Sequence, residues 1–341
     1  MTCEVLATES PAKFDEAIRR AVALLRDGQV VALPTETVYG LAANALDAAA
    51  VQRIFEVKGR PAHNPVIVHV SSVAMARQVV LSWPRLAQQL ADAFWPGPLT
   101  MVLPRSKAVP DVVCAGGRTV AVRWPKHPVT EAIIRNCGFP LAAPSANRSS
   151  RVSPTLARHV LKSLGKRIAL IVDGGKADMG IESTVLDLSQ SPPRVLRPGP
   201  IHPESLLAVT GELNTSPALR HGSLKSPGQL PKHYAPRARL VLLSWASDVE
   251  FRKQISKLKV PKLAMHVLTR TLVQGAPGFG GFCVMPRQAR AYARALYGEL
   301  HRCDEAGAKM IVVEAPPAGL QWEAIRDRLA RAASPSSGRR A

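Results

Sequence analysis

The stretch Gln29-Val-Val-Ala-Leu-Pro-Thr-Glu-Thr-Val-Tyr-Gly40 joins a short apolar run to a polar cluster of two threonines and one glutamate. The apolar run is rich in β-branched residues and predicts a buried strand that ends at Pro34. An amphipathic helix is predicted before the strand, because Ser10-Pro11 can open it and Gly28 can end it. Ligands of open α/β sheets bind where strands end, so the polar cluster marks a candidate site.

The same alternation of helices and strands continues along the chain. Further strands are predicted at residues 65–70, 99–103, 119–123, 140–143, 168–172, 184–188 and 195–197. Helices are predicted at residues 47–57, 84–94, 130–135, 154–164 and 201–209. Alternating elements are typical of an α/β fold, so we predict one α/β domain over residues 1–210.

A change in composition separates this domain from the rest of the chain. Periodicity fades over residues 211–237, where Ser, Pro, Gly and Asn accumulate, which predicts a linker. Strands are predicted beyond it at 240–243, 263–267 and 310–313, and helices at 249–258, 289–303 and 322–332. This pattern predicts a small Rossmann-like domain over residues 238–333. It lacks a G-x-G-x-x-G fingerprint, and we interpret Gly278-Phe-Gly-Gly281 as a structural turn. Residues 334–341 are predicted to be a frayed tail.

Length and composition restrict the class of protein. The chain has 341 residues, of which 46% are hydrophobic and 21% charged, so a globular protein with two domains is favoured. The formal net charge of +20 suggests anionic ligands or nucleic acid, although arginines on solvated faces explain it equally well. The five cysteines are scattered, and no apolar run is long enough to span a bilayer. We therefore expect a reduced, cytoplasmic protein without a membrane partner.

Two further polar clusters lie beside predicted strands. In Lys58-Gly-Arg60-Pro two cations flank a glycine, so both could face one anion such as a polyphosphate; an ordinary basic loop is the alternative. Ala143-Pro-Ser145-Ala-Asn147 closes a predicted strand. Ser153-Pro154 is predicted to open a helix whose free N–H groups could meet phosphate, but taken alone Ser153 fits a simple N-cap better than a ligand.

Single polar residues at other strand ends complete the pattern. Thr119 and Arg123 bracket one predicted strand, Ile181-Glu-Ser183-Thr precedes another, and Arg197-Pro-Gly-Pro200 ends a third. The sequence contains no nucleophile elbow, P-loop, HExxH motif or metal-ligand spacing of His and Cys. A set of hydroxyls, an amide and several cations fits phosphate-ester substrates that are handled by positioning and charge stabilisation.

Taken together, these motifs closely resemble the Sua5/YrdC/YciO family. The resemblance is carried by Leu33-Pro-Thr-Glu-Thr-Val-Tyr-Gly-Leu41, Lys58-x-Arg60-Pro with Asn64-Pro, Ser145-x-Asn147 and Arg197-Pro-Gly-Pro200, and covers residues 1 to about 209. Ser226-Pro-Gly228, His233-Tyr-Ala-Pro236 and the additional α/β domain are similar to the two-domain Sua5 branch. The resemblance implies a twisted, mostly mixed sheet around a basic concave cavity, with a linker that folds back over the cavity.

The activity that the resemblance implies is a nucleotidyl transfer. L-threonine, bicarbonate or CO2, and ATP would give threonylcarbamoyl-adenylate and pyrophosphate, for the threonylcarbamoyl modification of adenosine 37 in ANN-decoding tRNAs. Mg²⁺ would be carried by the ATP phosphates, with no metal ligand from the protein. The implied partners are small-molecule substrates, tRNA or double-stranded RNA, and a downstream threonylcarbamoyl transferase complex.

The resemblance also implies roles for individual residues. The residues expected to form the threonine pocket are Thr35, His69, Arg123, Ala143 through its backbone, and Ser183. Those expected to contact ATP are Arg60, Asn64, Thr119, Ser145, Ser153, Arg197 and, from the linker, His233 and Tyr234. Lys58, Arg60, Ser145 and Asn147 are expected to carry catalysis. Ala42 replaces an expected glycine, which predicts a less permissive backbone after Tyr39.

Two alternative functions remain at this point. A YciO-like paralogue could use another substrate, although the linker and the second domain argue against it. An RNA-binding module of the same family without synthase activity would fit the charge of +20, but aromatic residues make up only 5% of the chain and offer few stacking platforms for bases. Pyrophosphate release that depends on threonine would separate the synthase from both alternatives.

Overall fold

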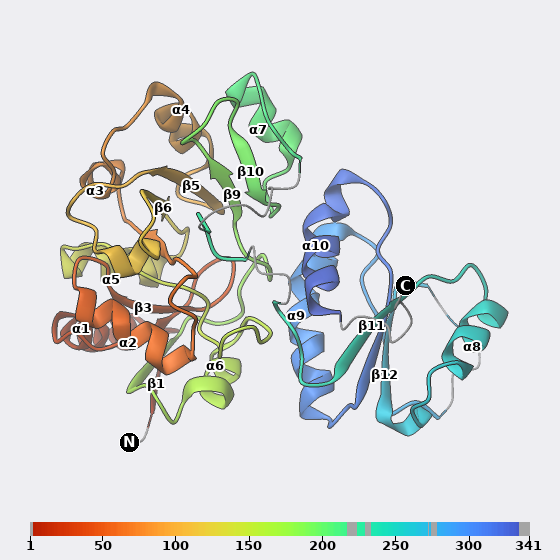
Figure 1. Cartoon of the computed structure of the whole chain (residues 1–341). Coiled ribbons are helices and arrows are strands. Elements are labelled where there is room, and N and C mark those ends of the chain that lie inside the picture. The colour runs from red at the N-terminus through yellow and green to blue at the C-terminus, as the bar shows by residue number, and fades with distance from the viewer. Residues whose placement is uncertain (1–2, 217–223, 229–232, 272, 274–277, 334–341) are drawn as a thin grey trace. The chain divides into compact units, whose positions relative to one another are not determined.

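The computed structural model describes residues 3–216, 224–228, 233–271, 273 and 278–333, and the chain divides into two compact units (Figure 1). The first unit comprises Met1–Ser149 with Ser153–Gln229, and the second comprises Ser150–Val152 with Leu230–Ala341. The predicted linker over 211–237 is therefore only partly described. The predicted tail, residues 334–341, lies outside the described residues.

The first unit is built on a mixed sheet. Its strands are β1 (Glu4–Ala7), β2 (Val31–Leu33), β3 (Gly40–Asn44), β4 (Ile67–His69), β5 (Leu99–Pro104), β6 (Thr119–Arg123), β7 (Leu141–Ala142), β8 (Leu170–Asp173), β9 (Thr184–Asp187) and β10 (Arg194–Arg197). Among the described residues they form one ten-stranded sheet in the order β1-β8-β2-β3-β7-β4-β6-β5-β9-β10. Parallel pairs such as β4 with β6 and antiparallel pairs such as β5 with β6 both occur. The predicted α/β class with a mixed sheet is confirmed.

Helices bury both faces of this sheet. The helices of the unit are α1 (Pro11–Arg26), α2 (Ala48–Lys58), α3 (Val73–Val79), α4 (Arg85–Phe94), α5 (Pro128–Cys137), α6 (Ala157–Leu164), α7 (Pro203–Thr210) and the short η1 (Asp111–Cys114). Val31 and Leu33 of β2 belong to the core shared with α1 and α5, whereas Ala32 belongs to the core shared with α2, α3, α4 and α6. Because side chains of a strand alternate between faces, both sides of β2 are apolar.

The ends of α1 follow from its sequence. The Ser10 side chain accepts a hydrogen bond from the Lys13 N–H (3.4 Å), and Pro11 is the first helical residue. Gly28, just beyond the helix, has a φ of +69°, which glycine adopts without steric cost. The predicted helix is confirmed.

Strand β3 is not predicted from the sequence, because Gly40-Leu-Ala-Ala-Asn44 contains no β-branched residue. Its pairing with β2 on one side and β7 on the other makes it a strand. Ala42 lies opposite Val31 and is fully buried in the core shared with α1 and α5. A methyl group therefore fits at this position, and the backbone there is ordinary strand.

The second unit has a separate parallel sheet. Its elements are β11 (Arg239–Leu243), α8 (Asp248–Ser256), η2 (Lys262–Ala264), β12 (Met265–Thr269), β13 (Gly281–Val284), α9 (Ala289–Glu305), β14 (Met310–Glu314), η3 (Leu320–Trp322) and α10 (Glu323–Ala332). The strands run parallel in the order β11-β14-β12-β13. Phe251 and Ile255 of α8 pack with Val267 and Val312 of the sheet. The predicted Rossmann-like fold class of this unit is confirmed, and Gly281 begins β13 rather than belonging only to a turn.

Gly199 allows two chain segments to approach closely in the first unit. A Cβ atom at this position would lie 2.3 Å from the backbone nitrogen of Thr184, whereas a Cβ at Gly298 in α9 would meet nothing within 4 Å. We expect Gly199→Ala to lower the free energy of unfolding of the first unit by about 1–3 kcal/mol through overpacking. Gly298→Ala should raise that of the second unit by roughly 0.5–1 kcal/mol, because alanine favours helix. Urea unfolding followed by circular dichroism measures both, and a Gly199→Ala protein as stable as wild type would contradict the close approach.

Candidate functional site

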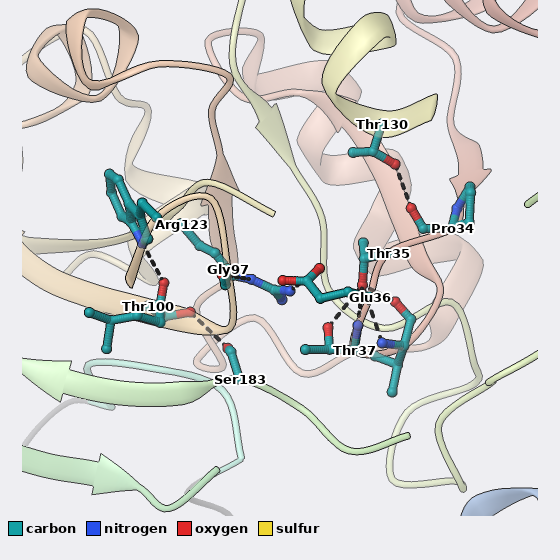
Figure 2. Close-up of polar contacts among 12 residues, drawn as sticks. Pro34, Thr35, Glu36, Thr37, Gly97, Thr100, Arg123, Thr130 and Ser183 are labelled. Atoms are coloured by element: carbon teal, nitrogen blue, oxygen red, sulfur yellow. Dashed lines mark hydrogen bonds and ion pairs between the residues drawn. The ribbon is translucent and has the colours of Figure 1, made fainter. Parts of the chain in front are cut away.

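The polar loop after β2 is held in shape by the Thr35 hydroxyl. Thr35 Oγ1 accepts hydrogen bonds from the backbone N–H groups of Thr37 and Val38, both at 3.2 Å, and donates to the Val38 carbonyl at 2.6 Å (Figure 2). The Glu36 carbonyl accepts the Met179 N–H at 2.7 Å. The predicted threonine-site residue Thr35 therefore orders the loop, and the loop fixes the backbone from which Glu36 extends.

Glu36 forms a buried ion pair with Arg123. Figure 2 shows the Glu36 side chain reaching the guanidinium group, where Arg123 Nη2 lies 2.7 Å from Glu36 Oε2. Arg123 Nε also donates to the Gly97 carbonyl at 3.2 Å. Glu36 lies within the motif of residues 33–41, but the sequence alone assigns it no role, because no local pattern links it to Arg123 at the end of β6.

His69 lies next to this ion pair. It ends β4 and is paired in register with Arg123 at the end of the parallel strand β6. Burial above all, and the neighbouring Arg123 charge, hold the pKa of His69 well below its usual value, so its imidazole is neutral. Burial also lowers the pKa of His127, while the charge of Glu36 acts in the opposite direction. The structure thus brings together the predicted residues His69 and Arg123, and adds Glu36 and His127.

A second group of polar side chains connects Ser183, which is predicted to bind the threonine substrate, with Arg197, which is predicted to bind ATP. Ser183 Oγ lies 2.8 Å from Thr100 Oγ1, and Arg197 donates from Nη2 to Ser183 Oγ and from Nε to the Ser183 carbonyl, both at 3.0 Å. Arg197 Nη1 also donates to the Pro227 carbonyl at 3.3 Å. The Ser226-Pro-Gly228 motif therefore contacts the first unit at Arg197.

Lys58 and Arg60 brace two different loops. Lys58 ends α2, and its buried Nζ donates to the backbone carbonyls of Ser145 and of Asn147, the latter at 2.5 Å. Arg60 donates to the Asn64 carbonyl (2.9 Å), to Asn64 Oδ1 (2.7 Å) and to the Pro65 carbonyl (2.7 Å). Burial, and secondarily the charge of Arg60, lower the pKa of Lys58 well below its usual value. Gly59, with a φ of +60°, turns the chain between the two cations.

Ser153 is not a helix N-cap. Helix α6 begins at Ala157 rather than at Pro154, and the Thr155 N–H is bound by His159 Nδ1 at 3.3 Å. Ser153 is fully buried, and its hydroxyl donates to Glu182 Oε1 at 2.6 Å. The predicted start of this helix is wrong because side-chain contacts, and not an N-cap serine, order the segment before it.

The remaining residues predicted for the first unit lie at the ends of its strands. Thr119 is the partly buried first residue of β6, opposite Pro104. Ala143 follows β7, and its N–H donates to the Ile67 carbonyl at 2.9 Å. Ala143 therefore lies beside β4, the strand that ends in His69.

His233 and Tyr234 belong to the second unit. Tyr234 has a φ of +60°, its ring stacks on Tyr297 with centroids 6.0 Å apart, and the Arg328 guanidinium lies 5.2 Å from the ring centroid. The His233 N–H donates to the Arg331 carbonyl at 3.2 Å. Helices α9 and α10 therefore place these two residues, whereas the first unit places all other predicted site residues.

The described part of the chain offers neither a metal cluster nor a membrane span. Within residues 3–216, 224–228, 233–271, 273 and 278–333, no three His, Cys, Asp or Glu side chains are arranged to hold a metal ion. In the same ranges no helix has both the length and the apolar surface for crossing a bilayer.

The neutral state of buried His69 should make stability depend on pH. In the unfolded chain a histidine binds a proton near pH 6.5, whereas folded His69 stays neutral because its pKa is lowered, so the free energy of unfolding falls as the pH drops below about 6.5. We expect His69→Asn to flatten this decrease by up to about 1.4 kcal/mol per pH unit between pH 6 and 5. Urea denaturation at several pH values measures the slope. The exposed His63 provides the control His63→Asn, and a wild-type slope in His69→Asn would contradict the neutral state.

Two family models match consecutive parts of the chain. The Sua5/YciO/YrdC model, described as telomere recombination, matches residues 23–199. A model described as the threonylcarbamoyl-AMP synthase C-terminal domain matches residues 201–334. The Sua5/YciO/YrdC model precedes the C-terminal model along the chain, which is the order that the sequence motifs predict.

Similar proteins cover almost the whole chain. Threonylcarbamoyl-AMP synthase of Pyrococcus abyssi is 40% identical over 318 residues, which are 92% of this chain and 93% of the relative. The protein of that name from Bacillus subtilis is 40% identical over 331 residues, covering 96% of this chain and 95% of the relative. The crystal structure of P. abyssi Sua5 complexed with L-threonine matches with a TM-score of 0.87 and 37% identity, over 97% of each chain. A P. abyssi Sua5 variant with one histidine and one tyrosine replaced by alanine matches with the same TM-score. The chain belongs to the Sua5/YciO/YrdC family.

Proposed function

We propose that this protein is a threonylcarbamoyl-AMP synthase, an enzyme that makes threonylcarbamoyl-adenylate and pyrophosphate from L-threonine, bicarbonate or CO2, and ATP. The observation that carries the proposal is the similarity, over both domains, to proteins of that name and to a structure that contains L-threonine. Because the similarity extends through the C-terminal domain, it favours the synthase over a YciO-like paralogue and over an RNA-binding module.

The group around Arg123 is suited to an amino acid. The guanidinium of Arg123 can bind an α-carboxylate through two parallel hydrogen bonds. The neutral imidazole of His69 can exchange a hydrogen bond with a substrate hydroxyl. We assign the threonine side of the reaction to these two residues together with Thr35, Ser183 and the backbone of Ala143.

The cations of the first unit are suited to the triphosphate. Asn64 is fully buried, and its Nδ2 has no acceptor among the described residues, so it is a donor for a bound nucleotide. The residues assigned to ATP in the first unit are Arg60, Asn64, Thr119, Ser145, Ser153 and Arg197. Lys58 holds the carbonyls of Ser145 and Asn147 and so shapes that loop. The assignment of Tyr234 and His233 to ATP belongs to the same proposal.

The chemistry needs positioning rather than a protein nucleophile. The threonine ammonium group first loses a proton to give the free amine, which adds to CO2 and loses a second proton to give a carbamate. A carbamate oxygen then attacks the α-phosphorus of ATP while pyrophosphate leaves. Buried Arg and Lys groups in a low-dielectric site stabilise the charge that develops on the phosphates. Lys58, Arg60, Ser145 and Asn147 are the residues we assign to this step.

The remaining components belong to the proposal as well. Mg²⁺ would enter on the ATP phosphates, whose oxygens supply its ligands, so it needs few ligands from the protein. In the cytoplasm, a downstream threonylcarbamoyl transferase would transfer the threonylcarbamoyl group of the product to adenosine 37 of ANN-decoding tRNAs. Direct binding of tRNA or double-stranded RNA is an additional activity that the charge of +20 would assist.

A pyrophosphate-release assay tests the reaction. We expect release to require ATP, bicarbonate and L-threonine. Serine lacks one methyl group and should be roughly 10- to 200-fold poorer in kcat/KM, whereas valine should be poorer still, because a site that binds a hydroxyl rejects an analogue without one. Release independent of the amino acid would contradict the proposal, and salt-dependent tRNA binding without ATP turnover would favour the RNA-binding alternative.

Arg60→Ala tests the nucleotide side. Loss of a charge-assisted contact to the triphosphate should weaken ATP binding about 10- to 100-fold, and Lys58→Ala should act in the same direction. Calorimetry with ATP measures the affinity. The matched control is Arg53→Ala, because Arg53 lies on α2 and contacts only a surface carbonyl, that of Gly28 at 2.8 Å, among the hydrogen bonds described. Unchanged ATP affinity in a folded Arg60→Ala protein would remove Arg60 from the site.

A further inference from the structure

Glu36 is a buried acidic side chain that the reaction scheme above does not use. The side chains of Glu36 and Arg123 are only 6% and 5% exposed, and the two groups are 2.7 Å apart. Despite this distance, neither Glu36 oxygen has a donor in hydrogen-bond geometry among the described residues, and Arg123 Nη2 has no acceptor in such geometry. A carboxylate has about four acceptor sites, so most of the hydrogen-bonding capacity of Glu36 is unused.

The backbone holds this carboxylate in its position. The Thr35 hydroxyl closes the loop around Glu36, and the Glu36 carbonyl is bound by the Met179 N–H. Figure 2 shows the side chain of Glu36 extended between the threonines of the loop and the guanidinium of Arg123. The unused acceptors therefore lie beside the group to which the substrate carboxylate is assigned.

We propose that Glu36 binds the α-ammonium group of the amino-acid substrate while Arg123 binds its α-carboxylate. The two charged groups of an amino acid are attached to one carbon atom, so the protein groups that complement them must be neighbours, as Glu36 and Arg123 are. An ammonium group brings three donors, which suit a buried carboxylate that lacks them. This inference rests on the proposed function and extends it, because it makes Glu36 the residue that selects free α-amino acids over hydroxy acids.

The selection can be measured by comparing two ligands. L-threonine and 2,3-dihydroxybutyrate of matching stereochemistry share the carboxylate and the β-hydroxyl, and differ in having an ammonium or a hydroxyl group on the α-carbon. Calorimetry on the full chain should show that wild type prefers threonine. In Glu36→Gln we expect threonine affinity to fall about tenfold or more, with dihydroxybutyrate binding unchanged or tighter, so that the ratio of affinities collapses.

The control is another buried glutamate that contacts an arginine. Glu314 in the second unit is 3.8 Å from Arg270 and accepts hydrogen bonds from the Thr269 hydroxyl and the Thr271 N–H. Glu314→Gln should keep the wild-type ratio. An equal loss for both ligands in Glu36→Gln, or no loss for either, would overturn the inference and leave Glu36 as a counter-charge of Arg123.

Two further outcomes keep the test decisive. If Glu36→Gln does not fold, Glu36→Asp replaces it in the test. This variant retains the negative charge but shortens the side chain by one methylene group, which moves the carboxylate away from the substrate. An unchanged ratio of affinities in Glu36→Asp would overturn the inference. If wild type binds no threonine, the proposed function itself fails. Wild-type threonine binding with an unchanged ratio in a folded Glu36→Gln protein refutes only the role of Glu36.

Discussion

The first unit depends on the need of buried cations for oxygen partners. Lys58, Arg60, Arg123 and Arg197 are each at most 8% exposed. Burying a charge without a partner is costly, so each of these side chains must be met by carbonyl, hydroxyl or carboxylate oxygens. The segments that supply those oxygens are the loops at the strand ends. The cations thereby determine where these loops lie, and the loops carry several of the residues expected to bind substrate, among them Asn64, Ser145 and Ser183.

The sheet explains why the polar groups gather in loops. Two apolar cores lie on opposite faces of the first unit's sheet, and short strands such as β2 send side chains into both. Few positions within the strands can then hold a charge, because either face is covered by helices. Thr35, His69 and Arg123 accordingly follow or end their strands. Buried cations at such positions interact strongly with anions, since little water screens them.

The segment between the predicted domains has a fixed contact on each unit. In the first unit Lys225 Nζ lies 2.8 Å from Asp187 Oδ2, and Arg197 binds the Pro227 carbonyl. In the second unit the Ala235 N–H donates to the Ser150 carbonyl, and Asp304 accepts the N–H groups of Arg237 and Ala238. Pro227 of one sequence motif and Ala235 of the other are therefore each hydrogen-bonded within their own unit.

Local sequence determined the elements and the family. Ser10-Pro11 and Gly28 set the ends of α1, apolar periodicity gave most helices and strands, and ordered motifs such as Lys58-x-Arg60-Pro identified the family. Only the tertiary structure decided that β3 is a strand and that Ser153 binds Glu182 rather than capping a helix. It also decided that Lys58 and Arg60 brace separate loops, and that Glu36 faces Arg123. The physical reason is the sequence separation over which each interaction acts. Helix caps and apolar periodicity depend on residues a few positions away, whereas a buried charge is paired with groups from segments far apart in sequence, which only the folded chain brings together.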